Sequence, residues 1–177
     1  MQILFVCTGN TCRSPMAEWL FNSKVKRLGL TDNITAKSAG IFAAEGAPAS
    51  EQAVQIIHEQ GGDLTQHRSQ TVTPGLIEEV DLILTMTYEQ KQHLLTSYPD
   101  IIVNGKDETA ESLLIDDNGN TTVMQLSEYA EKLNENTLTK TDIRDPIGGT
   151  TEEYYQVFSE LDQLITLIVD YLAKTLY

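Results

Sequence analysis

A tight turn between a strand and a helix near the start of the chain constrains the fold more than any other segment. Residues 3–6 are apolar, with β-branched and aromatic side chains that are typical of a strand buried on both faces. Cys7 ends this strand, and Arg13 follows after five intervening residues. Ser14 and Pro15 predict a helix start, because a hydroxyl can cap free amides and proline suits the first helical position. The thiol and the arginine therefore belong to one short strand-to-helix loop.

The residues of this loop are suited to bind an anion. They are Thr8, Gly9, Asn10, Thr11 and Cys12. Glycine and asparagine tolerate positive φ, so successive backbone N–H groups can face inward, and the helix N-terminus adds partial positive charge. Arg13 adds a planar set of donors that matches two oxygens of a phosphate. The positive charge of the helix N-terminus and of Arg13 also favours the thiolate of Cys7, so Cys7 is a candidate nucleophile that needs no histidine base.

Other interpretations of the cysteines fit less well. Zinc normally takes four ligands, and besides Cys7 and Cys12 the chain offers only His58, His67 and His93, so we expect no metal. The first cysteine could also be an ordinary buried strand residue, but the arginine and the capped helix start argue against this. A Walker phosphate loop is excluded, because no G-K-[ST] follows the glycine.

Residues 7–14, CTGNTCRS, resemble the signature of the low-molecular-weight protein phosphatases, a Cys-x5-Arg-Ser family. Further matches follow in the order that the family shows. They are Ser38-Ala39-Gly40, His67-Arg68-Ser69 and Asp145-Pro146. The resemblance covers nearly the whole chain apart from residues 99–122, and it implies an enzyme that needs no cofactor, acts on phosphorylated protein substrates and releases phosphate. We call residues 7–14 the phosphate loop.

The resemblance implies a two-step phosphoryl transfer. Cys7 attacks phosphorus, Arg13 binds the phosphate oxygens, and Asp145 protonates the leaving group. Asp145 then acts as a base toward the water that releases phosphate from the cysteine. Without the resemblance, this aspartate would be one more Asp-Pro turn, which is a common sequence pair.

The resemblance also implies supporting roles around the nucleophile. Ser14 donates its hydroxyl to the thiolate, Asn10 holds the loop in a strained turn, and Ser38 and His67 support Asn10 from behind. From the residues alone, His67 reads almost equally well as a surface histidine. Cys12 matches a second loop cysteine that can form a reversible disulfide with the nucleophile and protect it from deeper oxidation.

Three positions bear on substrate selectivity. Tyrosine-directed relatives usually carry an aliphatic residue at the position of Thr11, whereas members resembling bacterial protein-arginine phosphatases carry threonine. An isoleucine there would crowd a phosphoguanidinium and leave its N–H donors unpaired. Ile147 stands where tyrosine-directed relatives commonly place tyrosine and arginine-directed relatives an aromatic residue, and Phe42 can supply one aromatic wall. Protein phosphoarginine is the favoured substrate, with protein phosphotyrosine as the alternative.

Two functions of other classes are weaker interpretations. Arsenate reductases of the same fold use a relay of further cysteines, and no cysteine follows Cys12. A non-catalytic phosphoprotein-binding module would be expected to lack the nucleophile or the acid, and both Cys7 and Asp145 are present.

Strands and helices are predicted to alternate, and 177 residues suit a single domain, 1–177. The expected strands are 3–7, 34–38, 82–86 and 123–126. The expected helices are 14–28, 50–60, 74–80, 88–98 and 152–174. The prediction is a three-layer α/β/α fold of the phosphatase I-like kind, with a four-stranded parallel sheet and the phosphate loop at the carboxyl edge of the first strand.

The predicted departure from compact relatives lies in residues 99–122. Residues 113–115 and 121–124 predict a hairpin around the Asp/Asn-rich residues 116–120. A calcium loop is disfavoured, because Thr121 stands where the sixth position needs glycine. Residues 130–144 are expected to form a polar loop that leads to Asp145, the expected general acid.

The charge and the composition limit the partners. A net charge of −14 argues against nucleic acid, although residues 1–30 carry four basic side chains against one acid, Glu18. No apolar stretch is long enough for a membrane span. The two cysteines both lie in the phosphate loop, so we expect a reducing cytoplasm. We also expect a monomer or weak dimer.

Overall fold

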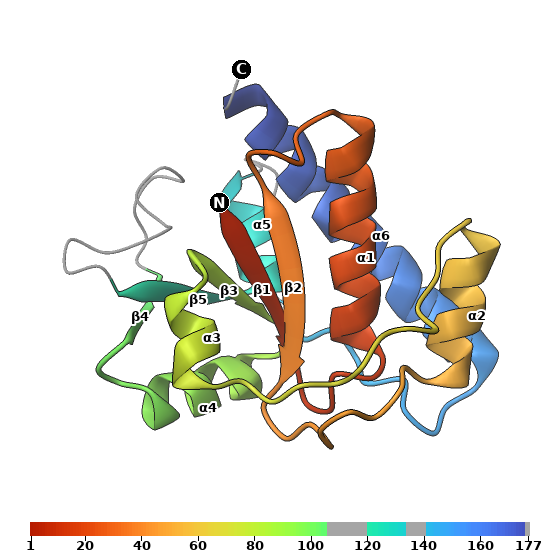
Figure 1. Cartoon of the computed structure of the whole chain (residues 1–177), viewed down its shortest axis with the longest axis horizontal. Coiled ribbons are helices and arrows are strands. Elements are labelled where there is room, and N and C mark those ends of the chain that lie inside the picture. Colours follow the sequence, from red (N-terminus) through yellow and green to blue (C-terminus); the bar gives the residue numbers. More distant parts are fainter. Residues whose placement is uncertain (106–119, 134–140, 176–177) are drawn as a thin grey trace.

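A parallel sheet forms the middle layer of the computed structural model, which describes residues 1–105, 120–133 and 141–175 (Figure 1). In these residues the sheet has five strands in the order β2-β1-β3-β5-β4, and every neighbouring pair is parallel. The strands are β1 (Gln2–Cys7), β2 (Thr35–Gly40), β3 (Leu82–Thr85), β4 (Ile102–Asn104) and β5 (Thr121–Gln125). The helices are α1 (Arg13–Arg27), α2 (Glu51–Glu59), α3 (Pro74–Glu78), α4 (Tyr88–Ser97), α5 (Leu126–Leu133) and α6 (Thr151–Thr175).

Alternate side chains of β1 serve two separate apolar layers. Ile3 and Phe5 pack into the cluster that contains the buried faces of α1, α5 and α6. Leu4 and Val6 point to the opposite face and pack with residues of α3 and α4. The period of two along a strand places successive side chains on opposite faces, so a continuous apolar run fills both layers. The predicted α/β class, with a parallel sheet between helices, is confirmed.

The prediction of four strands is wrong, because β4 adds a fifth. It is a three-residue edge strand, and Ile102 pairs with Thr121 of β5. The predicted strand 123–126 corresponds to β5, which begins two residues earlier and ends at Gln125. So short an edge strand carries too little alternation to stand out in the sequence.

A helix occupies the beginning of the predicted polar loop 130–144. Helix α5 starts at Leu126, directly after β5, and buries Leu126, Tyr129 and Ala130. These residues have the i, i+3, i+4 spacing of a helical face, and this spacing was the available signal for α5. Of the remaining part of the predicted loop, the structure describes residues 141–144, which form neither helix nor strand and lead to Asp145.

The predicted hairpin lies partly outside the described residues. Its first strand, 113–115, is among those that the structure does not describe. Its second strand belongs to β5, where Thr122 is paired with Leu82 of β3 on one edge and Val103 of β4 on the other. Both neighbours run parallel to β5, so at this residue neither edge is free for an antiparallel partner.

The loops that follow the strands meet at the carboxyl edge of the sheet, at the lower end of the molecule in Figure 1. The backbone N–H of Ile41 donates to Cys7 O at 3.0 Å, and that of Met86 donates to Val6 O at 3.0 Å. Farther along the chain, the N–H of Ile143 donates to Met86 O at 2.9 Å. Four loops from distant parts of the sequence are thus joined behind one surface, as expected for ligand sites of open parallel sheets.

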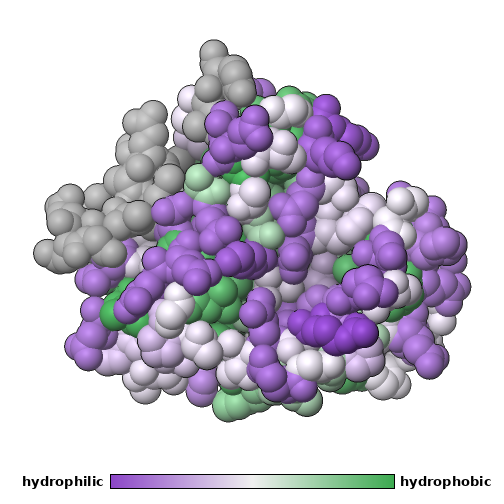
Figure 2. All heavy atoms as spheres, in the orientation of Figure 1, coloured by the Kyte–Doolittle hydropathy of each residue, from purple (hydrophilic) through white to green (hydrophobic). Residues whose placement is uncertain are grey.

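Hydrophilic residues cover most of the face seen in Figure 2, and apolar residues appear there as separate patches. None of the described helices is sufficiently long and apolar to cross a membrane.

Candidate active site

The thiol of Cys7 lies at the base of the phosphate loop, where β1 ends. It is 2% exposed. The backbone N–H of Asn10 donates to Cys7 Sγ at 3.2 Å, and Ser14 Oγ lies 3.0 Å from the same sulfur. Asn10 Nδ2 donates to Ser14 Oγ at 2.9 Å, so the single hydrogen of the Ser14 hydroxyl is left for the sulfur or for Ala39 O at 3.3 Å. A thiolate would be the stronger acceptor of the two, because it carries the charge.

Asn10 is the centre of the loop's internal support. Its φ is 55°, the left-handed region that asparagine tolerates better than most residues. Its side-chain amide also donates to Ser38 Oγ at 2.9 Å and accepts the backbone N–H of Gln70 at 3.0 Å. The ring of His67 contacts Asn10 O at 2.7 Å. The structure therefore places Ser38 and His67 against Asn10 and adds Gln70, which the sequence did not single out.

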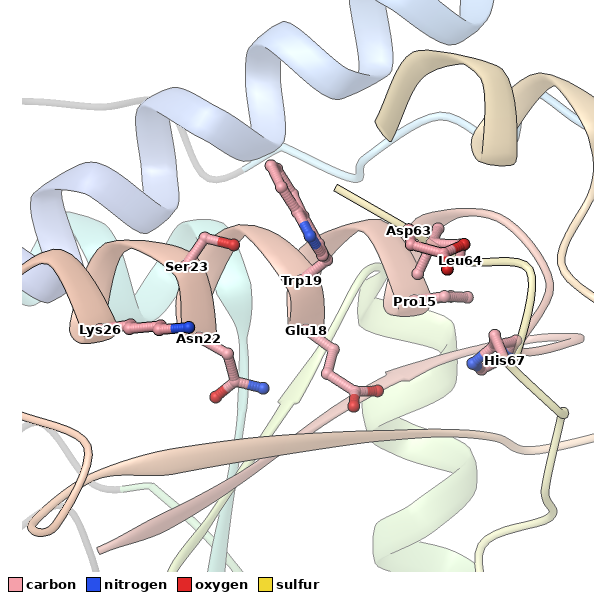
Figure 3. Close-up of a pocket in the computed structure, with 9 residues that line it drawn as sticks. All are labelled: Pro15, Glu18, Trp19, Asn22, Ser23, Lys26, Asp63, Leu64 and His67. Atoms are coloured by element: carbon pink, nitrogen blue, oxygen red, sulfur yellow. The ribbon is translucent and has the colours of Figure 1, made fainter. Parts of the chain in front are cut away.

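Glu18 extends this support behind the loop. Ser38 Oγ donates to Glu18 Oε2 at 2.6 Å. Burial raises the pKa of Glu18, and the Ser38 hydrogen bond and the charges of His67 and Lys37 oppose that rise. The carboxylate borders a hollow of about 340 Å³ beside α1, and Figure 3 shows it turned toward the His67 ring. The sequence alone indicates only that Glu18 is the single acid among the first 30 residues, and it predicts no contact with the loop.

Arg13 and Asp145 form an ion pair across the site, although 132 residues separate them. Arg13 is buried, and its NH1 donates to Ile143 O at 3.1 Å. Its Nε is buried as well and has no hydrogen-bond partner among the described residues. Asp145 is 40% exposed, and its second oxygen accepts the N–H of Ile147 at 3.2 Å. The acid predicted from Asp-Pro thus lies beside the arginine of the phosphate loop.

The segment that carries Asp145, residues 141–146, is the acid loop. Asp142 Oδ1 accepts two hydrogen bonds of 2.8 Å, from the N–H of Tyr88 at the start of α4 and from Gln125 Nε2 at the end of β5. Gln125 Nε2 also donates to Thr141 O at 3.0 Å. Neither Gln125 nor Asp142 belongs to a recognisable motif, so sequence reasoning missed both.

Cys12 has contacts of its own. Its Sγ lies 3.3 Å from Ser50 Oγ and 3.3 Å from Tyr154 OH. Burial, followed by the hydrogen bond with Cys12, raises the pKa of Tyr154 to about 12. Cys7 and Cys12 are both free thiols. A reversible disulfide between them stays a prediction.

A cavity of about 440 Å³ opens beside Arg13 and Asp145. Phe42 lines it, is 66% exposed and stacks edge-to-face on His93 with ring centroids 4.9 Å apart. Thr11 and Ile147, the other two predicted selectivity residues, are outside this lining. Thr11 Oγ1 lies 3.6 Å from Cys12 Sγ, and Ile147 is 66% exposed.

The described residues do not bring together three or more His, Cys, Asp or Glu side chains that could hold a metal ion. The chemistry available at the site is that of a thiol, a guanidinium and a carboxyl group. A nucleophile at the base of an anion-binding loop, with a carboxyl group at its rim, is suited to phosphoryl transfer.

The fold and the loop together define a cysteine-based protein phosphatase of low molecular weight. The family model described as "Low molecular weight phosphotyrosine protein phosphatase" matches residues 2–98. The chain belongs to this family, and it is a hydrolase of phosphorylated proteins.

Similar proteins extend over the whole chain. A protein-arginine-phosphatase of Bacillus subtilis (strain 168) is 36% identical over 174 residues, or 98% of this chain and 98% of the relative. The low molecular weight protein-tyrosine-phosphatase PtpB of Staphylococcus haemolyticus (strain JCSC1435) is 36% identical over 93% of this chain and 95% of the relative. A solved structure of a mutant YwlE arginine phosphatase with a phosphorylated active-site serine is 35% identical, with a TM-score of 0.77 over 96% of this chain and 94% of that one.

Proposed function

We propose that this enzyme hydrolyses phosphoarginine side chains of proteins through a phosphocysteine intermediate. The observation that carries the proposal is the position of Cys7 Sγ. It receives the N–H of Asn10 and lies against the Ser14 hydroxyl at the base of a loop whose arginine is paired with Asp145. Arg13 and Asp145 line one cavity, and Cys7 lies at the base of the loop that carries Arg13.

In the first step, the Cys7 thiolate attacks phosphorus and the P–N bond to the guanidino group breaks. The guanidino nitrogen takes a proton from Asp145, because a guanidine is a poor leaving group as an anion. A phosphate group bound to Arg13 competes with Asp145 for the same guanidinium. Substrate binding would thus turn the carboxyl group from the arginine toward the leaving group.

In the second step, water attacks phosphorus and the P–S bond of the phosphocysteine breaks. Asp145 accepts a proton from this water, and the products are inorganic phosphate and the Cys7 thiolate. The N–H of Asn10 and the hydroxyl of Ser14 stabilise the thiolate both as nucleophile and as leaving group. Ser38 and His67 serve this step through Asn10, whose strained conformation they support.

Arginine is favoured over tyrosine by the charges around the cavity. Glu89, Asp142 and Asp145 line it. Arg13, which would bind the phosphate, and Arg144, which is paired with Glu153, line it as well. Carboxylates pair well with a guanidinium and gain nothing from a neutral phenol ring. Thr11 lies outside the lining of this cavity, and it supports the same choice only through the resemblance to arginine-directed relatives, which carry threonine at this position. The similarity to the Bacillus subtilis protein-arginine-phosphatase agrees with this reading.

Protein phosphotyrosine is the second candidate. It is supported by the similarity to the staphylococcal protein-tyrosine-phosphatase and by the exposed Phe42, which can stack on an aromatic ring. Ile147 favours neither substrate, because it supplies no ring.

The first experiment compares kcat/KM on matched phosphoarginine and phosphotyrosine peptides, with Cys7→Ser as the blank. We expect a preference for phosphoarginine that Thr11→Ile reduces. A preference for phosphotyrosine in the wild-type enzyme would overturn the assignment to arginine and leave the cysteine mechanism in place.

Two further proposals concern the whole chain. We infer that residues 1–177 form one domain, because both apolar clusters share the same sheet. We also infer that the enzyme works with both cysteines reduced, as the cytoplasm would keep them.

A further inference from the structure

Gln90 joins helix α4 to the phosphate loop. It is the third residue of α4 and is 3% exposed. Its Oε1 accepts the backbone N–H groups of Met86 and Thr87 at 3.0 and 3.1 Å. Its Nε2 donates to Thr8 Oγ1 at 3.1 Å. Because two backbone donors require the oxygen on one side, the amide cannot be flipped and its nitrogen must face Thr8.

The contact to Thr8 is not needed for the helix. Gln90 and Thr87 form a capping box at the start of α4, and this box uses only the oxygen of the Gln90 amide. The nitrogen is left over, and it points to a residue 82 positions earlier in the chain. Gln90 thus makes two separable sets of contacts, one that stabilises α4 and one that orients a side chain of the active site.

The direction of this hydrogen bond determines what the Thr8 hydroxyl can offer. A hydroxyl has one hydrogen and two acceptor positions. Gln90 fills one acceptor position, so the hydrogen and the second lone pair remain available. The side chain of Thr8 is exposed, and both Thr8 and Gln90 line the same cavity as Arg13 and Asp145. The backbone of Thr8 is held as well, because its carbonyl accepts the N–H of Phe42 at 2.9 Å.

We propose that Thr8 is a specificity residue for phosphoarginine and that Gln90 is its positioning residue. This inference rests on the proposed function. The hydroxyl hydrogen of Thr8 donates to a phosphoryl oxygen, and its free lone pair accepts an N–H of the substrate guanidinium. A phosphotyrosine offers the same phosphoryl oxygens but has no N–H on its leaving group. The second hydrogen bond therefore forms with phosphoarginine alone.

The variant Gln90→Glu tests the positioning role of Gln90, because it reverses the polarity of its hydrogen bond with Thr8. A carboxylate still accepts from Met86 and Thr87, so the capping box is kept. Its other oxygen can only accept, and it would take the hydrogen of the Thr8 hydroxyl. We expect kcat/KM to fall about tenfold on both substrates, because the hydrogen bond from Thr8 to the phosphoryl oxygen is lost. The ratio of kcat/KM for phosphoarginine to kcat/KM for phosphotyrosine should not fall, because the lone pairs of the hydroxyl still accept the substrate N–H and the added charge attracts the guanidinium that only phosphoarginine carries.

Substitutions of Thr8 complete the test. Thr8→Val removes the hydroxyl and should lower the same ratio about tenfold, whereas Thr8→Ser keeps the hydroxyl and should preserve the ratio. In the Thr8→Val background, Gln90→Glu should lower kcat/KM much less, because Gln90 acts through Thr8. Thermal unfolding of each variant checks the fold. If Gln90→Glu does not fold, the pair Thr8→Val and Thr8→Ser decides alone.

Each outcome has one meaning. A ratio unchanged by Thr8→Val, or a kcat/KM that Gln90→Glu lowers to the same extent in both backgrounds, overturns this inference and leaves the proposed function intact. A wild-type enzyme that turns over both substrates but prefers phosphotyrosine overturns the proposed function, while the ratio still tests Thr8 and kcat/KM still tests Gln90. An enzyme with no turnover of phosphoarginine overturns both.

Discussion

The phosphate loop and the acid loop meet at Arg13 and Asp145, but they are held in different ways. Five side chains of the phosphate loop are buried, and several of their hydrogen bonds join residues of the loop itself. The five are Cys7, Asn10, Cys12, Arg13 and Ser14. Asp145 lies in a loop with three other exposed residues, held by contacts to distant elements. The phosphate loop is thus held by hydrogen bonds within itself and by Ser38, His67 and Gln70 behind Asn10. The acid loop, which faces the leaving group, is held by contacts to distant elements, so it can change without disturbing the phosphate loop.

The largest effect should follow from Asp145→Asn. An amide cannot protonate the guanidino nitrogen, so we expect kcat on phosphoarginine to fall by about 10²- to 10⁴-fold. Arg13 is buried and Asp145 is 40% exposed, and the oxygen of the asparagine amide can still accept from Arg13, so the melting temperature should fall only slightly. Steady-state kinetics on both substrates and a thermal melt provide the measurements. Equal and slight losses on phosphoarginine and phosphotyrosine would contradict the role of Asp145 as acid.

The phosphate loop can be loosened at Asn10. Asn10→Gly keeps a residue that accepts positive φ but removes the hydrogen bonds to Ser14, Ser38 and Gln70. We expect the free energy of unfolding to fall by about 2 to 4 kcal/mol. Asn10→Ala should lose about 1 kcal/mol more, because alanine is strained at a φ of 55°.

Urea unfolding of the two Asn10 variants separates hydrogen bonding from strain. If the glycine and alanine variants are equally stable, the backbone conformation at Asn10 carries no strain, and the difference between the two loops is one of hydrogen bonds alone. Phosphate affinity, measured by competitive inhibition, should weaken in both variants because the N–H groups lose their fixed direction.

The acid loop can be loosened at Gln125 without touching the phosphate loop. Gln125→Ala removes the donor that holds Thr141 O and Asp142. We expect kcat to fall about 3- to 10-fold while inhibition by inorganic phosphate stays unchanged, since Asp145 is positioned less well and the anion site is intact. Gln55→Ala, an exposed glutamine on α2, is the matched control and should leave both quantities unchanged. Weaker phosphate inhibition in the Gln125 variant would show that the two loops are not independent.

The smallest effect is expected from Glu18, which lies behind the phosphate loop and makes the free energy of unfolding depend on pH. Burial raises the pKa of Glu18 in the folded protein above its ordinary value of 4.5. The folded state therefore binds this proton more tightly than the unfolded state, and the contribution of Glu18 becomes less favourable as the pH rises from about 4.5 through the folded pKa.

Glu18→Gln removes this titration and can still accept from Ser38. We expect the variant to be more stable than the wild type at pH 7, by less than about 1 kcal/mol, and the difference to shrink as the pH falls toward 4.5. Urea unfolding at several pH values measures it. A difference that grows on acidification would contradict the raised pKa of Glu18.

Elements with a regular apolar pattern could be predicted from the sequence within a few residues. They are β1, α1, β2, α2, α3, β3, α4 and α6. The three-residue strand β4 has too few residues to show a period, and its place in the sheet depends on pairing with β5. Helix α5 follows β5 without an intervening turn residue, so the apolar run through Leu126 read as the continuation of a strand.

The residues of the site also fall into those that local spacing predicts and those that depend on tertiary contacts. Cys7, Arg13 and Ser14 are neighbours in the chain, and their spacing at a strand-to-helix turn was enough to predict an anion site. Gln90 and Gln125 carry no motif. What they do depends on which groups the sheet brings beside their amides, Thr8 in one case and Asp142 in the other.

The sequence by itself determined the chemistry of this protein, because a nucleophile, an anion-binding turn and a helix start can be encoded within eight consecutive residues. Only the tertiary structure decided where the acid lies, which side chains surround the leaving group and how the Thr8 hydroxyl is oriented. The physical reason is the range of the interactions. Backbone geometry and capping act between near neighbours, whereas the cavity is formed by loops that parallel strands bring together from opposite ends of the chain.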